Sequence, residues 1–480
     1  MNISLVIYVF GMMLKVEAAF LCLPFIVSLV YQDLPTGLIY LACAAGSLVL
    51  GLLMSIRKPR KNFYEREGLV TVAGCWLLMS AVGAVPLCLS GDIPSYLNAL
   101  FETVSGFTTT GASVLSNVEG LTKPGLFWRS FTHLVGGMGI LVFMLSLTPA
   151  ISGSSIHLMK AESPGPSVSK LTPKLQDTAL YLYGIYLGMT FLLFVLYLFG
   201  GMNAFDSLLL AMGTAGTGGF GIVNDSFCSY SPYVKNLTAT FMLLFGINFN
   251  LYFLLICGKV KDALKSEELH LFLTAVVAAV LGITFIILPQ YGGSFGKALQ
   301  DSYFQVAALV SSTGFASADF DVWPLAARVI LLLIMFMGAC AGSTGGGFKV
   351  SRILILFKAI KQEFFSFSHP HGVQTPNFEG KPLSKDVLHG TLVYLAVYGA
   401  LYLVSLLILS FDKQSFTTTF TAVLATINNI GPGLDGVGPT MNYDSFSALS
   451  KIVLIFDMLA GRLELYPMLF LFLPRTWKKN

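Results

Sequence analysis

Residues 108–112 read TTTGA, a run of small and hydroxyl-bearing residues that ends at a glycine between two apolar segments. Three further stretches share this design, namely GTGGF at 216–220, SSTGF at 311–315 and NNIGP at 428–432. Backbone that is not helical cannot face lipid, because each unpaired amide or carbonyl group there costs several kcal/mol. Such segments persist at membrane depth only where they line water or bind an ion. The four stretches together therefore predict one pore.

The composition places the chain among proteins that cross the bilayer several times. The 480 residues are 55% hydrophobic and 11% charged, and the mean hydropathy is +0.75. A soluble protein of this length needs a larger charged surface. The first apolar run continues past Phe25 without a basic leader, so we expect a transmembrane helix there and not a cleaved signal peptide. The seven cysteines form no C-x-x-C pair, and we interpret them as packing residues.

Ten apolar stretches are long enough to cross about 30 Å of hydrocarbon, which takes about 20 helical residues. The sequence therefore predicts an all-α polytopic membrane protein with ten transmembrane helices. Their approximate bounds are 3–31, 36–56, 68–90, 125–148, 178–201, 233–257, 269–289, 324–348, 386–410 and 447–473.

Lysine and arginine gather after every even-numbered predicted span. Basic residues of short loops resist translocation, so these segments are expected in the cytoplasm together with both termini, and the four glycine stretches in the external connections. The basic loops account for the formal charge of +4, so no nucleic-acid partner is expected. The residues are Arg57, Lys58, Arg60, Lys61, Arg66, Lys160, Lys170, Lys174, Lys259, Lys261, Lys265, Lys349, Arg352, Lys358, Lys361, Arg475, Lys478 and Lys479.

The glycines of the four stretches are spaced roughly a hundred residues apart, which indicates an internal repeat. Each unit has a span, a short half-apolar segment, the glycine stretch and a second span. The half-apolar segments are too short to cross the bilayer, and we predict re-entrant pore helices at 95–108, 203–215, 296–311 and 415–428. Their C-terminal ends carry partial negative charge and can point at a cation. The predicted units are an N-terminal hairpin at 1–66 and repeats at 67–176, 177–266, 267–380 and 381–480.

The chemistry of the four stretches is expected to lie in their backbone carbonyls, because a cation that enters such a pore needs oxygens to replace its water shell. Glycine allows backbone conformations that a Cβ atom forbids. The side chains of Thr110, Thr217, Thr313 and Asn429 are expected to hold the loops by hydrogen bonds. The alternative is that glycine and threonine only mark helix-packing faces. The candidate carbonyls belong to Thr109, Thr110, Gly111, Thr217, Gly218, Gly219, Ser312, Thr313, Gly314, Asn429, Ile430 and Gly431.

The chain resembles the bacterial TrkH and KtrB potassium transporters over essentially its whole length. The resemblance rests on the four glycine stretches, GSTGGGFK at 342–349 and GRLELYP at 461–467, and the N-terminal hairpin is more similar to TrkH. It implies four membrane-pore-membrane units around a pseudo-fourfold axis, potassium as the transported ion, and a place in the bacterial inner membrane. Glycine in all four loops is typical of family members that prefer potassium to sodium. One departure is GTGGFG at 216–221, which carries more glycine than the family pattern.

The resemblance also implies protein partners. These are a second copy, in a homodimer whose protomers each keep a permeation path, and a cytoplasmic ring of TrkA-like nucleotide-binding subunits that control the gate. The basic loops after spans four, six and eight are candidate docking surfaces for the ring. No nucleotide site is expected in this chain, because Phe348 stands where a phosphate loop requires lysine. The G-x-G-x-x-G spacing at 216–221 lies between membrane spans, where no dinucleotide fold is expected.

The segment GACAGSTGGGFK at 338–349 lies in the cytoplasmic half of the eighth predicted span. Each glycine costs a helix roughly 1 kcal/mol relative to alanine, so the span is predicted to break here. The alternative is close helix packing around the glycines. The resemblance implies an intramembrane gate loop under the filter, formed by Ala341, Gly342, Ser343, Thr344, Gly345, Gly346 and Gly347.

Arg462 lies about 20 Å along the predicted helix from Arg475, so it is too deep for the cytoplasmic basic cluster. A buried arginine is costly and is usually paired or functional. The resemblance implies that Arg462 faces the pore beneath the gate loop, holds that loop and raises a barrier to cations. The alternatives are pairing with Asp457 and snorkelling to the interface. Lys15 and Glu17 in the first span are expected to pair or snorkel and not to conduct.

These features predict a gated, channel-like pathway for potassium uptake that is driven by the membrane potential, and not an enzyme. No nucleophile with an acid-base partner can be assembled from the polar residues. His369 and His371 are too few ligands for a metal site. Other functions stay open, namely potassium symport coupled to sodium or protons, conduction of sodium or ammonium, and a sensor subunit that conducts nothing.

Overall fold

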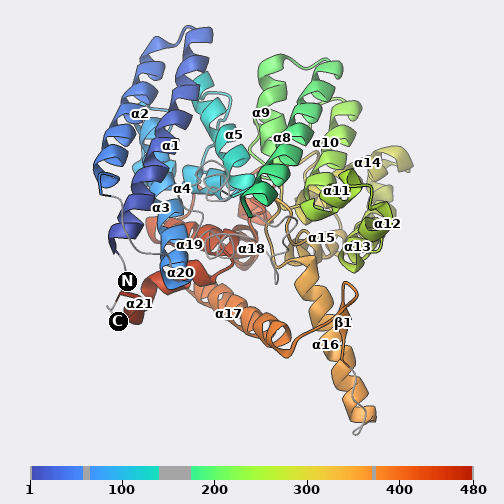
Figure 1. Ribbon diagram of the computed structural model, residues 1–480. Helices are drawn as coiled ribbons and strands as arrows, with labels where there is room; N and C mark the ends of the chain where they lie inside the picture. Colours follow the sequence, from blue (N-terminus) through green and yellow to red (C-terminus); the bar gives the residue numbers. More distant parts are fainter. Residues whose placement is uncertain (1–2, 58–64, 140–174, 370–374, 478–480) are drawn as a thin grey trace.

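The computed structural model describes residues 3–57, 65–139, 175–369 and 375–477, and these ranges are mostly helical (Figure 1). The N- and C-terminal ends lie close together in this view. The predicted features outside the described residues are the end of the span at 125–148, Lys58, Arg60, Lys61, Lys160, Lys170, Lys174, His371, Lys478 and Lys479.

Two long helices, α1 (Ile3–Val30) and α2 (Leu34–Met54), form a hairpin at one edge of the molecule (Figure 1). Asp33 caps α2, since its carboxylate accepts a hydrogen bond from the Thr36 amide at 3.4 Å. Gly11 and Gly51 let the two backbones touch, because a Cβ atom on either glycine would strike the carbonyl oxygen of the other. The hairpin therefore packs backbone to backbone.

Four successive segments of the chain then show the same order of elements: a long helix, a short helix, a loop and a further helix that is often broken. The first two segments contain α3 (Glu65–Leu89), α4 (Tyr96–Phe107) and α5 (Lys123–Gly137), then α8 (Leu175–Phe199), α9 (Ala204–Ala215), α10 (Pro232–Phe245) and α11 (Phe249–Ile256). The third and fourth contain α13 (Glu267–Ile287), α14 (Phe295–Val310), α15 (Leu325–Met337) and α16 (Val350–Ser368), then α17 (Lys385–Leu409), α18 (Phe416–Ile427), α19 (Ala448–Arg462) and α20 (Tyr466–Phe472).

Short elements complete the chain. The antiparallel strands β1 and β2 turn at Glu379 and Gly380, whose φ values of +50° and +72° suit a tight hairpin. The elements are α12 (Val260–Leu264), β1 (Asn377–Phe378), β2 (Lys381–Pro382), α21 (Pro474–Trp477) and the 3-10 turns η2 (Leu288–Tyr291), η3 (Phe320–Val322) and η4 (Asp435–Val437).

The short helices α4, α9, α14 and α18 coincide with the half-apolar segments, so the prediction of helices there is confirmed. They have 12, 12, 16 and 12 residues. At 1.5 Å per residue they are about 18–24 Å long, which is less than the hydrocarbon thickness. Side chains cap two of them, since Asn203 accepts from the Asp206 amide at 2.8 Å and Ser415 from the Thr418 amide at 3.0 Å. Each of the four ends at one of the glycine stretches.

Six helices of the described residues are long and apolar enough to cross a bilayer, and the pair α10–α11, bent by 90°, adds a seventh. The predicted total of ten spans stays a prediction. Three predicted spans are interrupted in the structure: 233–257 and 447–473, whose prediction as unbroken helices is wrong, and 324–348, which was predicted to break. In two of them the backbone leaves the right-handed region, with φ +68° at Gly338 and +65° at Leu465, and a helix cannot continue through such a residue. The predicted break of the eighth span is thereby confirmed.

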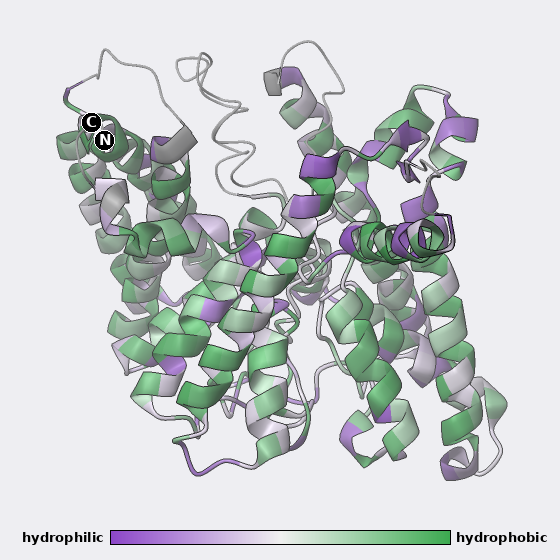
Figure 2. Ribbon diagram, turned by 90° about the horizontal axis from the view of Figure 1, so that it is seen from below, coloured by the Kyte–Doolittle hydropathy of each residue, from purple (hydrophilic) through white to green (hydrophobic). Residues whose placement is uncertain are grey.

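The outer surface of the helices is apolar. Figure 2 shows hydrophobic residues along most of their length. Phe191 and Phe199 of α8 and Leu403 of α17 are among the large apolar side chains that are more than half exposed. Such extensive apolar exposure suits a lipid surround and not water. Inside, one cluster of buried apolar residues extends from α1 to α20.

Two predictions about charged residues are wrong. Glu17 was expected to pair or snorkel, but it is fully buried, and neither of its carboxylate oxygens has a hydrogen-bond partner among the described residues. Lys15 lies two residues away on α1, and residues at that spacing do not face each other on a helix. Lys349 and Arg352 were expected in a cytoplasmic basic loop, yet both are buried. They belong to the interior site described next.

Candidate functional site

The four loops share one backbone conformation. The left-handed φ values of 54°, 52°, 58° and 53° belong to Thr109, Thr217, Ser312 and Asn429. Two residues later, φ is again positive, at 76°, 81°, 80° and 95°, at Gly111, Gly219, Gly314 and Gly431. The residue between them donates its amide hydrogen to the carbonyl five residues earlier, at 2.8–2.9 Å in all four loops. This is the Schellman arrangement that ends a helix, so each short helix is terminated in the same way.

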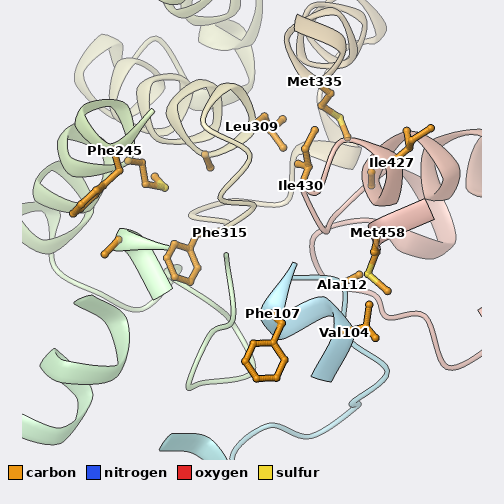
Figure 3. Close-up of a cluster of buried hydrophobic side chains, with 14 of the residues drawn as sticks. Val104, Phe107, Ala112, Phe245, Leu309, Phe315, Met335, Ile427, Ile430 and Met458 are labelled. Carbon is orange, nitrogen blue, oxygen red and sulfur yellow. The ribbon is translucent and has the colours of Figure 1, made fainter. Parts of the chain in front are cut away.

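The loops meet in a closed circuit. A Cβ atom on Gly111 would strike the carbonyl oxygen of Gly218, and one on Gly219 would strike that of Thr313. A Cβ atom on Gly314 would strike the oxygen of Ile430, and one on Gly431 that of Thr110. Each glycine therefore touches the next loop in order, and the fourth touches the first. Figure 3 shows the loops around a common centre, with Ala112, Phe315 and Ile430 labelled on three of them.

The four glycines line one pocket of about 150 Å³. Most of its other lining residues follow one of the glycines in sequence, within 112–118, 220–226 and 437–443, and Arg129 of α5 lines it as well. Nearby Asp435 accepts hydrogen bonds from the hydroxyls of Ser415 and Thr418, and these bonds lower the pKa of its carboxyl group. This side of the loops therefore carries a carboxylate that stays ionised.

The four side chains expected to hold the loops all make hydrogen bonds. Thr110 shares one with Thr108 at 2.8 Å, Thr313 shares one with Ser311 at 2.7 Å, and Thr217 donates to the Gly216 carbonyl at 2.6 Å. Two of the four also join two loops, because the Asn429 amide donates to the Thr110 hydroxyl at 2.9 Å. The fourth loop is thus tied to the first through side chains as well as through the glycine contacts.

Three supports of the loops were missed by the sequence analysis. Glu102 of α4 accepts from Arg129 of α5 at 2.6 Å and 2.9 Å, and both side chains are buried. Tyr443 donates to the Gly431 carbonyl at 2.6 Å. His133 lies between the first and second loops. The ionisable residues among them could have been found, because charges within apolar segments are costly and mark structural or functional sites.

The segment between Gly338 and Lys349 lies against the ends of the short helices α14 and α18. The Gly346 amide donates to the Ser312 hydroxyl at 2.5 Å. A Cβ atom on Gly345 would strike the carbonyl oxygen of Ser311, and one on Gly346 would strike that of Asn428. The segment therefore contacts the third and fourth loops where the helices end, whereas the pocket is lined by the glycines that follow, Gly314 and Gly431.

The same segment is bound at the α10–α11 bend. The Cys340 amide donates to the Gly246 carbonyl at 3.1 Å, and the Phe249 amide donates to the Gly342 carbonyl at 3.0 Å. Glu268 of α13 holds both of its ends, since one carboxylate oxygen accepts from the Ala341 amide at 2.7 Å and from the Ser351 amide at 3.1 Å. The segment is an ordered loop that is held by backbone hydrogen bonds.

Arg462 joins this loop to the first segment of the chain. Its guanidinium donates to the Thr344 carbonyl at 2.7 Å and to the carbonyls of Gly136 and Gly137 at 2.5 Å and 2.7 Å. Asp457, the alternative partner, accepts from the Ser405 hydroxyl at 2.8 Å. The arginine thus contacts the loop, and the barrier to cations that the resemblance implies stays a prediction.

A second buried cation lies close by. Arg352 pairs with Glu464, and its guanidinium carbon lies 3.8 Å from the centre of the Tyr394 ring. Glu464 and Leu465 both have left-handed φ values, +61° and +65°. This backbone is strained, and such strain is maintained only where the surroundings hold it. The GRLELYP segment at 461–467 therefore supplies Arg462 to the loop and Glu464 to Arg352, which follows the loop in sequence.

Comparison with known proteins gives concordant results. Residues 39–479 match the family model TrkH, described as a cation transport protein. The chain is 32% identical to the Trk system potassium uptake protein TrkH of Escherichia coli K12, and the match covers 100% of both chains. It is 30% identical to the Trk system potassium uptake protein TrkG of the same strain, over 99% of each. The fold is similar to the crystal structure of the potassium transporter TrkH from Vibrio parahaemolyticus, with a TM-score of 0.89, 30% identity and complete coverage of both chains.

Proposed function

Because the chain belongs to the TrkH family of cation transport proteins, we propose that it takes up potassium across the bacterial inner membrane through the ring of four loops. The observation that carries this proposal is the closed circuit of glycines and carbonyl oxygens, which gathers backbone oxygens from four distant segments around one centre. Relatives along the full length are named potassium uptake proteins, and this supports the choice of ion.

The ion is held by the candidate carbonyls of the four loops. A dehydrated cation needs several oxygen ligands at once, and oxygens from four sides replace its water shell. The C-terminal ends of α4, α9, α14 and α18 carry partial negative charge and lie at the loops, so their dipoles favour a cation there. The four segments form four membrane-pore-membrane units around a pseudo-fourfold axis.

The membrane potential supplies the driving force. A potential of 100 mV, negative inside, is worth about 2.3 kcal/mol per monovalent cation, which concentrates potassium roughly fiftyfold. No ATP site is required in this chain. Both termini lie in the cytoplasm, a second copy completes a homodimer, and TrkA-like subunits dock on the cytoplasmic loops and control the gate.

Rubidium uptake into liposomes that contain the purified protein alone tests the proposal. We expect uptake that follows an imposed inside-negative potential and that sodium competes with weakly. Equal competition by sodium would favour a sodium pathway, and uptake that requires a sodium or proton gradient would favour symport. Absence of any flux, in protein that gel filtration shows to be folded, would contradict a conducting role.

The loop from Ala341 to Gly347 acts as the gate, and Arg462 holds it closed. The guanidinium of Arg462 donates three hydrogen bonds, and a hydrogen bond from a charged donor stabilises the structure by about 1.5–3 kcal/mol. Arg462→Ala is therefore expected to raise the open probability by about tenfold or more, since about 1.4 kcal/mol corresponds to a factor of ten. Single-channel recording in planar bilayers measures this quantity, with Arg328→Ala as control, because the ion pair of Arg328 with Asp321 is partly exposed.

Unchanged flux and gating in Arg462→Ala would contradict this role. Alanine at Gly345 or Gly346 provides an independent test, because the added Cβ atom meets the carbonyls at the ends of α14 and α18. Altered open probability supports a moving loop. Loss of protein yield without altered gating supports the alternative, in which these glycines only allow close packing.

A further inference from the structure

His133 of α5 bridges the first short helix and the second loop. Its Nδ1 atom lies 2.8 Å from the carbonyl oxygen of Gly106, one residue before the end of α4. Its Nε2 atom lies 3.3 Å from the amide nitrogen of Phe220, the residue after Gly219. The side chain is completely buried. A single imidazole thus contacts two of the four segments that form the ring.

The two contacts determine the protonation of the ring. A carbonyl oxygen can only accept, so Nδ1 carries the hydrogen, and a backbone amide can only donate, so Nε2 has a free lone pair. The imidazole is therefore neutral and in one tautomer. Both of its polar atoms are used, which is the condition for burying them at low cost.

The imidazole also explains the additional glycine of the second loop. A Cβ atom on Gly218 would strike the ring of His133. On the other side of Gly219, the Phe220 ring lies with its centroid 4.2 Å from that of His133, and the Arg129 guanidinium carbon lies 4.1 Å from the same Phe220 ring. The histidine therefore contacts the loop on both sides of its central glycine.

These contacts bear directly on the ring of carbonyls. The carbonyl oxygen of Gly218 is the one that faces Gly111, so the position of Gly218 sets the spacing between the first and second loops. In the fourth segment the matching position is Met458. Gly136 and Gly461 each approach the last carbonyl of their short helix, at Phe107 and Ile427, and His133 and Met458 each lie three residues before that glycine. The hydrogen-bonding side chain at this position in the first segment has an apolar counterpart in the fourth.

We propose that His133 is a positioning residue for ion selection, which holds the second loop at the distance from the first that discriminates potassium from sodium. The inference rests on the proposed function. Loss of both hydrogen bonds frees Phe220 and Gly218 to shift, and a ring of oxygens that can shrink loses its preference for the larger ion.

The test compares the preference for rubidium over sodium in liposomes for His133→Leu and His133→Gln. Leucine fills the space but cannot hydrogen-bond, and we expect the preference to fall by about tenfold or more, because both hydrogen bonds are lost. Glutamine places an amide near the Nε2 position and offers both an acceptor and a donor, so it is expected to retain the preference. His389→Leu, at an exposed histidine, is the matched control.

The outcomes separate the two proposals. Absence of flux in the wild-type protein contradicts the proposed function. If the wild type is selective and His133→Leu keeps the same preference, only the positioning role is overturned. The positioning role is also overturned if His133→Gln loses as much of the preference as His133→Leu. Gel filtration of each variant reports folding. If His133→Leu does not fold, His133→Asn replaces it, since its shorter amide reaches Gly106 but not Phe220, and an unchanged preference in that variant overturns the inference.

Discussion

Gly111→Ala is expected to lower potassium-selective rubidium uptake by about two orders of magnitude. Gly111 has φ +76°, and a left-handed conformation costs a residue with a Cβ atom about 1–2 kcal/mol. The new methyl group would also strike the Gly218 carbonyl, and overpacking costs about 1–3 kcal/mol. The strain falls on an oxygen of the ring itself. A combined cost near 3 kcal/mol corresponds to about a hundredfold change in the working population.

Liposome uptake measured against the amount of folded protein checks this prediction. Gly188→Ala is the matched control, because Gly188 lies on α8 and its new methyl group would meet no neighbouring atom within 4 Å. Alanine is favoured over glycine in a helix by about 1 kcal/mol, so this variant is expected to transport normally and to be no less stable. Normal selective uptake by Gly111→Ala would remove the basis for placing the ion between these loops.

Glu102→Gln is expected to lower the free energy of unfolding by about 3–5 kcal/mol, because it leaves the Arg129 charge buried without its carboxylate. The two side chains are 0% and 2% exposed, respectively. Glu102 also accepts from the Ser113 hydroxyl at 2.9 Å and from the Val114 amide at 3.1 Å, so it fastens the chain that follows the first loop. The substitution removes the charge but keeps the shape.

The fraction of protein that remains monodisperse in detergent as the temperature rises measures this effect. Asp444→Asn serves as control, since the Lys451–Asp444 pair has its carboxylate 58% exposed and such pairs contribute about 0–1 kcal/mol. The double variant Glu102→Gln with Arg129→Met is expected to be more stable than Glu102→Gln alone, because no unpaired charge remains. If Glu102→Gln and the control Asp444→Asn lose equal stability, the expectation that a buried unpaired charge is the more costly is wrong.

Much of the architecture could be predicted from local pattern. The half-apolar segments predicted the bounds of α4, α9, α14 and α18 closely, because a short apolar segment that ends at a helix-terminating glycine stretch has few other structures available in a membrane. The break before Lys349 followed from helix propensity. The break at Gly246 was missed, because it lies in a run as apolar as a continuous span and hydropathy does not report backbone direction. The break at Leu465 was missed although Arg462, Glu464 and Pro467 interrupt the apolar run there.

The amino-acid sequence by itself determined that the chain is a polytopic membrane protein with four short helices, each of which ends at a glycine-containing stretch, since hydropathy and the tolerance of glycine for a left-handed φ are properties of composition and single residues. Only the tertiary structure decided which loop touches which and which buried groups support them. His133 between the first and second loops, Glu102 with Arg129, and Arg462 on the carbonyls of Thr344 and Gly136 join residues far apart in the chain. A polar side chain in an apolar segment signals that it needs a partner, but the partner is a matter of distance in space, which no local pattern contains.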